Sequence, residues 1–116
     1  MKILTHGLLF LMLCTSVAVA HDCTRESRSL ADKHLTEKRQ LNDRHKTERR
    51  ALHDKHEGEN SALQQGKADL KLRRDLEDRQ LSEKRGLNDK QRNEKRALKD
   101  AHKKARQELK TSCGKA

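Results

Sequence analysis

The sequence lacks the residues from which most folded domains build a core. It contains no proline, tryptophan or tyrosine, and its single phenylalanine, Phe10, lies within the first twenty residues. Beyond residue 20 there is also no isoleucine, valine or methionine, so the apolar side chains there are leucine, alanine and two cysteines. A globular domain is excluded, because so little apolar surface cannot offset the cost of ordering the backbone. Strands are not expected either, because residues that fill pleated surfaces are scarce.

The N-terminal segment has the pattern of a secretory signal peptide. Lys2 is its only charged residue, residues 3–13 are mostly apolar, and the Ala-Val-Ala at residues 18–20 suits a signal peptidase. We therefore expect residues 1–20 to be removed and the chain to begin at His21, in a secreted or periplasmic protein. No later stretch is apolar enough to predict a transmembrane segment after signal removal.

The rest of the chain is organised as an eleven-residue repeat with a regularly placed leucine. Two arrays of leucines spaced eleven residues apart occur, and the second follows the first after 46 residues. Eleven residues make close to three turns of α-helix, so the stripe drifts only about 20° per repeat. The remaining composition, rich in Leu, Ala, Lys, Arg, Glu and Gln, favours helix. The predicted seam between helices consists of Leu30, Leu41, Leu52, Leu63, Leu76, Leu87, Leu98 and Leu109.

The two arrays predict two antiparallel helices joined by a turn. Gly58 and Gly66 weaken helix near the junction, and on one continuous helix a shift of 46 residues would rotate the stripe by about 280°. We predict an all-α, coiled-coil-like hairpin forming a single module over residues 21–116. Its helices should span about 25–63 and about 73–110, with a turn at about 64–72. The alternative is one long charged helix, either alone or as a dimer.

The cysteines and the polar residues beside the leucines indicate how the helices align. Cys23 precedes the first predicted helix and Cys113 follows the second, so a hairpin in an oxidising compartment should join them in a disulfide. When residues whose numbers sum to 139 are paired, each of the eight seam leucines faces another seam leucine. The same register places polar pairs between the leucine layers: His45–Glu94, His56–Glu83, His102–Glu37, Gln91–Glu48 and Gln80–Glu59.

The histidines raise a second hypothesis, an exported protein that binds zinc or copper. His53 and His56 are three residues apart, and cleavage before His21 would leave an N-terminal amine beside an imidazole. By contrast, His45 and His56 are eleven residues apart, about 16 Å along a helix, so they cannot share one ion. Interfacial histidines paired with glutamates are the preferred interpretation, and no cofactor is expected.

Charge gives the preferred functional prediction. No pocket-forming core is expected, so burial cannot shift a pKa or exclude water, and we therefore expect no enzymatic activity and assign no catalytic residues. The formal net charge of +10 favours anionic partners. Without aromatic residues to stack on bases, sequence-specific nucleic-acid binding is not expected. The sequence predicts an exported binding or structural module for an anionic polymer, an envelope surface or unfolded protein, and it allows self-association.

Overall fold

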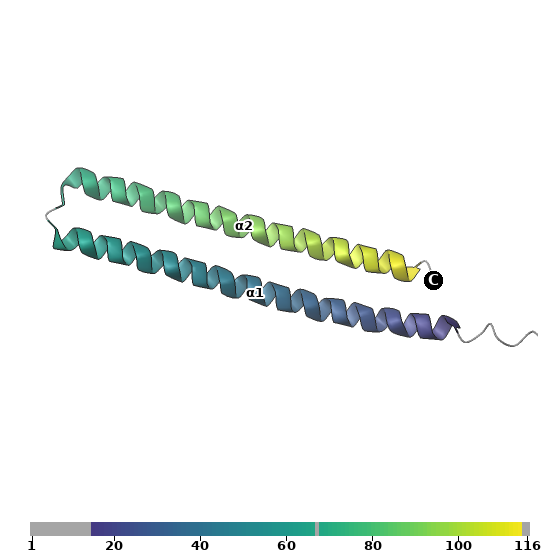
Figure 1. The fold of residues 1–116 in the computed structure, drawn as a ribbon. Coiled ribbons are helices and arrows are strands. Elements are labelled where there is room, and N and C mark those ends of the chain that lie inside the picture. The colour runs from purple at the N-terminus through teal and green to yellow at the C-terminus, as the bar shows by residue number, and fades with distance from the viewer. Residues whose placement is uncertain (1–14, 67, 115–116) are drawn as a thin grey trace, which may run out of the picture.

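The computed structural model of the protein consists of two long α-helices joined by one tight turn (Figure 1). It describes residues 15–66 and 68–114, with side chains from residue 23 onward. Helix α1 spans Thr15–Gln65 and helix α2 spans Leu70–Gly114. The helices run antiparallel and side by side. The predicted helical hairpin is therefore confirmed.

The turn is shorter than the sequence predicted, and both helices are longer. After α1, the Gly66 N–H donates to the Ala62 carbonyl at 3.3 Å, and the Ala68 N–H donates to the Gly66 carbonyl at 2.8 Å. Asp69 occupies the N-cap position of α2, where its carbonyl accepts the Arg73 N–H at 3.2 Å. The observed turn lies inside the predicted range of about 64–72, since α1 ends at Gln65 and α2 begins at Leu70. It is shorter because the helix-forming residues after Asp69 begin α2 as soon as the chain reverses.

The predicted signal peptide, residues 1–20, lies outside the described residues except for the backbone of 15–20, which begins α1. Helix α1 thus starts ahead of the predicted first residue, about 25, because nothing in this segment breaks a helix. Within residues 15–66 and 68–114, neither helix combines the length and apolar character needed to cross a membrane.

The interface between the helices is polar at its most buried points. Among the described side chains no hydrophobic residue is buried, and the eight seam leucines are only half-buried. The most buried residue is His45, with an exposed fraction of 0%. A two-helix interface stays open to solvent along both edges, so it cannot enclose a leucine as a multi-layer core does. The buried side chains of the described chain are His45, His56, Gln80 and Gln91.

A disulfide closes the end of the hairpin opposite the turn. Cys23 and Cys113 are joined with their Cα atoms 5.9 Å apart, which confirms the predicted pairing. The two residues are separated by 90 positions in the chain. Closing so large a loop restricts the unfolded chain and stabilises the fold by about 4–5 kcal/mol in the chain-entropy description.

Removal of the disulfide should therefore destabilise the hairpin strongly. We expect the Cys23→Ser/Cys113→Ser variant to lose about 4–5 kcal/mol of unfolding free energy relative to the oxidised protein. Urea titrations followed by helical circular dichroism measure this difference. Reductant should lower the stability of the wild type and leave the double variant unchanged. Equal stability of the oxidised protein and the double variant would contradict the prediction.

Candidate functional site in the polar seam

Polar layers cross the interface at the residues four and seven positions after the seam leucines. In an α-helix these positions lie on either side of the leucine stripe, so both face the partner helix. Each layer contains two residues from α1 and two from α2. The central layer is His45, Glu48, Gln91 and Glu94; the turn-side layer is His56, Glu59, Gln80 and Glu83; the open-end layer is His34, Glu37, His102 and Ala105.

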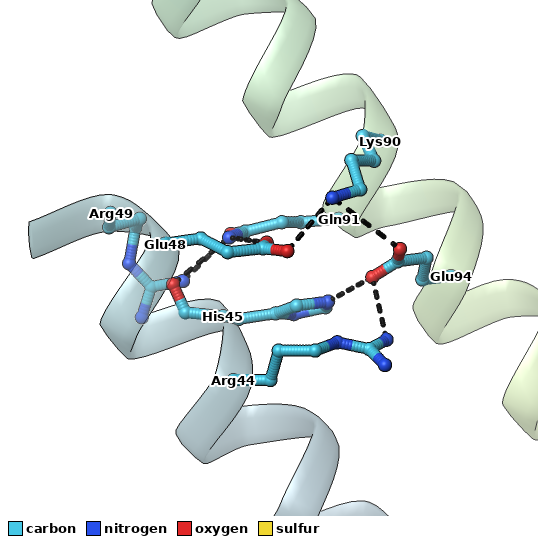
Figure 2. Close-up of polar contacts among 7 residues, drawn as sticks. All are labelled: Arg44, His45, Glu48, Arg49, Lys90, Gln91 and Glu94. Carbon is cyan, nitrogen blue, oxygen red and sulfur yellow. Dashed lines mark hydrogen bonds and ion pairs between the residues drawn. The ribbon is translucent and has the colours of Figure 1, made fainter. Parts of the chain in front are cut away.

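In the central layer each helix holds a carboxylate of the other (Figure 2). His45 Nε2 of α1 donates to Glu94 Oε2 of α2 at 2.6 Å. In return, Gln91 Nε2 donates to Glu48 Oε2 at 3.1 Å and to the His45 carbonyl at 3.0 Å. Arg49 Nη1 donates to Gln91 Oε1 at 2.8 Å. The buried Gln91 amide is therefore hydrogen-bonded through both its oxygen and its nitrogen.

Two cations on one side of this layer, Lys90 and Arg44, form ion pairs with its glutamates. Lys90 Nζ lies 2.8 Å from Glu48 Oε1 and 4.0 Å from Glu94 Oε1, and Arg44 Nη2 lies 3.1 Å from Glu94 Oε2. The Lys90 ammonium, together with the Gln91 amide, lowers the pKa of Glu48. The hydrogen bond from His45, followed by that from Arg44, lowers the pKa of Glu94. Both carboxylates are thus held in their charged form.

The turn-side layer repeats this arrangement. His56 Nε2 lies 2.7 Å from Glu83 Oε2, and Lys55 Nζ lies 2.8 Å from Glu83 Oε1. Gln80 Nε2 donates to Glu59 Oε2 at 3.1 Å. The hydrogen bonds from Lys55 and His56 lower the pKa of Glu83 from 4.5 to about 2.

The open-end layer departs from the other two. His102 Nε2 lies 2.8 Å from Glu37 Oε2, but Ala105 stands where His34 would find a carboxylate. The His34 ring stacks instead on the His102 ring, with centroids 3.8 Å apart and planes inclined by 17°. Partial burial and the neighbouring His102 lower the pKa of His34. The lysine that flanks this layer, Lys33, has its ammonium 4.0 Å from the Glu37 carboxylate.

The register proposed from the sequence is the register of the structure, because all five predicted polar pairs are in contact. A second pairing between the helices was not predicted from the sequence. In this pairing, the layer residues that lie four positions after a seam leucine are neighbours across the interface when their numbers sum to 136. The disulfide between Cys23 and Cys113 and the stack of His34 on His102 both follow it. The signal was present: the cysteines extend the eleven-residue series of the layer residues by one step at each end.

The histidines predicted as metal ligands do not come together. His53 is 75% exposed and lies beside Asp54 and Glu57, at 3.5 Å and 3.8 Å. His56 is buried and bonded to Glu83. Among the described residues, no group of ligand atoms close enough to share an ion contains both His53 and His56. The side chain of His21 lies outside the described residues.

Comparisons with protein-family models, with curated proteins and with solved structures give no match. The surface and the seam of the chain itself are therefore what indicate a function.

The depressed pKa of Glu83 predicts a specific acid dependence of stability. Because the folded value, about 2, lies below the ordinary 4.5, the ionised carboxylate stabilises the fold above pH 4.5. This contribution is lost as the pH falls towards 2. Glu83→Gln should therefore lower the melting temperature at pH 6, and its difference from the wild type should vanish near pH 2.

Thermal melts from pH 2 to pH 7 followed by circular dichroism would test this dependence. Glu77→Gln, which changes an exposed carboxylate on the same helix, serves as the matched control and should follow the wild-type curve. A Glu83→Gln deficit that stays constant from pH 7 to pH 2 would contradict the assignment of the Lys55 and His56 contacts.

Proposed function

We propose that the protein is an exported basic module that binds linear anionic polymers along one flank of the hairpin. The proposal rests on a difference between the two sides of the seam. Within the described part of the chain, the cations on one side form ion pairs with glutamates of the polar layers, and those on the other side do not. Every Lys and Arg whose side chain the structure describes is exposed, whereas five glutamates are drawn into the seam. The outer surface is therefore more basic than the composition alone implies.

On one flank the cations are neutralised by the seam. These residues lie three positions after a leucine, and each forms an ion pair with a glutamate of a polar layer. Lys90, for example, pairs with Glu48, and Arg79 Nη2 lies 3.0 Å from Glu59 Oε1. The paired flank consists of Lys33, Arg44, Lys55, Arg79 and Lys90.

On the opposite flank the cations form no ion pair with any residue that the structure describes. They lie eight positions after a leucine, about 80° round the helix from the stripe, whereas the paired flank lies about 60° away on the other side. Arg49 contacts a neutral partner, the amide oxygen of Gln91. The unpaired flank consists of Lys38, Arg49, Lys84, Lys95 and Arg106.

Both helices present their unpaired cations on the same side of the molecule. Arg49 of α1 and Lys84 of α2 line one groove with a volume of about 760 Å³. Its wall also contains the uncharged polar residues Asn60, Asn88 and Gln91, the apolar Leu52 and Leu87, and one carboxylate, Glu57. Hydrogen-bond donors and unpaired cations in one groove suit sulfate, phosphate or carboxylate groups.

The straight, repeating form of the flank favours a linear polymer over a membrane or an unfolded chain. Equivalent positions recur about every 16 Å along each rod, so several charges of one polymer can be contacted at once. The exposed large hydrophobics of the described chain, at 46–62% exposure, are Leu35, Leu70, Leu72 and Leu81. Leu70 and Leu72 lie together at the start of α2, and Leu35 and Leu81 lie further along the rod, so the four provide no continuous apolar surface for an acyl layer or an apolar peptide. The signal-like segment at residues 1–20 supports export. The disulfide is compatible with export, because disulfides form in oxidising compartments outside the cytoplasm.

Neutralising the unpaired flank should weaken polymer binding. We expect the Lys38/Lys84/Lys95/Arg106→Gln variant to bind a fluorescent sulfated oligosaccharide at least about tenfold more weakly, with a shallower salt dependence, because fewer counterions are released. The control is Arg39/Arg50/Arg85/Arg96→Gln, which removes the same charge from helix faces turned away from the seam. Anisotropy titrations at several salt concentrations measure both.

Equal losses in the two variants would show that general charge, and not this flank, attracts the polymer. Anionic vesicles and a reduced, unfolded protein are tested in parallel. Tighter binding of either than of the oligosaccharide would contradict the choice of partner.

A further inference from the structure

The open-end layer differs from the other two layers at three positions of α2. The equivalents of Gln91, Glu94 and Lys90 in this layer are His102, Ala105 and Ala101. The first change supplies a second imidazole, and the second removes one carboxylate. The third removes the cation that would reach across to the carboxylate of α1. Helix α1 keeps the His-x-x-Glu pattern that it has in every layer.

These changes leave three donor side chains close together and accessible. His34, Glu37 and His102 are all half-buried, and one donor atom from each lies within 4.8 Å of the others. In a tetrahedral zinc site donor atoms lie about 2.0–2.2 Å from the ion, hence about 3.4 Å from one another. To bind one ion, the His34 ring would leave its stack on His102 and rotate so that a nitrogen of each imidazole points at the same position.

The carboxylate in this layer is also the least neutralised of the seam. Glu37 has His102 at 2.8 Å and Lys33 only at 4.0 Å. In the central layer the Lys90 ammonium lies 2.8 Å from Glu48, so a cation already occupies the position that a metal ion would need. A third cluster, around the exposed His53, takes all its donors from one short stretch of α1 and has no residue from α2 to fix it.

The geometry points to a binding site for a divalent transition-metal ion, with zinc as the best match, formed by His34, Glu37 and His102. Two imidazole nitrogens and one carboxylate oxygen would bind the ion, and water would complete its coordination. This donor set is one that zinc accepts when three protein ligands leave a position open. Because the ligands come from both helices, the ion would join α1 to α2 beside the disulfide. This inference is independent of the polymer-binding proposal.

Titration of the disulfide-closed protein with zinc tests the site. We expect one ion per chain by calorimetry at pH 7.5, and cobalt substituted for zinc should give the intense visible bands of four-coordinate geometry. His102→Gln should weaken binding at least about tenfold while keeping the helical melt, because glutamine occupies this position in the other two layers. His53→Gln, which changes an exposed histidine, should bind zinc as the wild type does. Zinc binding that survives His102→Gln, or no binding to the wild type, would overturn the proposal.

A second variant leaves all three ligands in place. Ala101→Lys restores the cation that the other layers carry at this position, and its ammonium should compete with the ion for Glu37. We expect weaker zinc binding and unchanged helicity. Wild-type affinity in this variant would contradict the role assigned to the missing cation.

Discussion

The hairpin depends on one kind of contact, a carboxylate of one helix held by a histidine or glutamine of the other. No described hydrophobic side chain is buried, so leucine packing alone gives little preference among alignments that differ by one repeat. A carboxylate brought into the seam without a partner is costly, because it loses water and gains no hydrogen bond. A shift by one repeat would keep most of these pairs but would place Glu59 opposite Asp69, or Glu37 opposite Cys113. The observed alignment therefore gives every layer carboxylate a histidine or glutamine, in the way that buried polar residues set the register of coiled coils.

Much of this arrangement could be predicted because the repeat is nearly exact. The seam leucines, the two cysteines and the glutamates of the polar layers each occupy one place in an eleven-residue pattern, so helical geometry fixes which residues share a face. The features that could not be predicted depend on how deeply each side chain is buried between the two helices. The stack of His34 on His102 requires knowing that this position lies deeper than the leucines. The turn was placed too broadly because the spacing of the leucines does not show how closely the two helices approach the point of reversal, where α1 continues to Gln65 and α2 begins at Leu70.

The same repeat produces two different surfaces from one set of charges. Glutamates drawn into the seam neutralise the cations on one flank and leave those on the other without partners. This division is the basis of the face that we propose for polymer binding. Where the repeat is altered, at Ala101, His102 and Ala105, the layer exchanges an ion-paired cation for an additional imidazole. Both proposed activities thus arise from how each layer distributes its cations.

On this description of the seam, the polar layers set the register without help from the disulfide. Distances between spin labels at Ala51→Cys and Asn88→Cys, which lie at the same level of the two helices, test it most directly in a Cys23→Ser/Cys113→Ser chain. Pulsed electron resonance should give one narrow, short distance. We expect additional distances, offset along the rod by about 16 Å, once the layer residues are replaced by leucine. The residues replaced are His45, His56, Gln80 and Gln91. Several distances with the layers intact, or a single unchanged distance in the leucine variant, would show that the layers do not set the register.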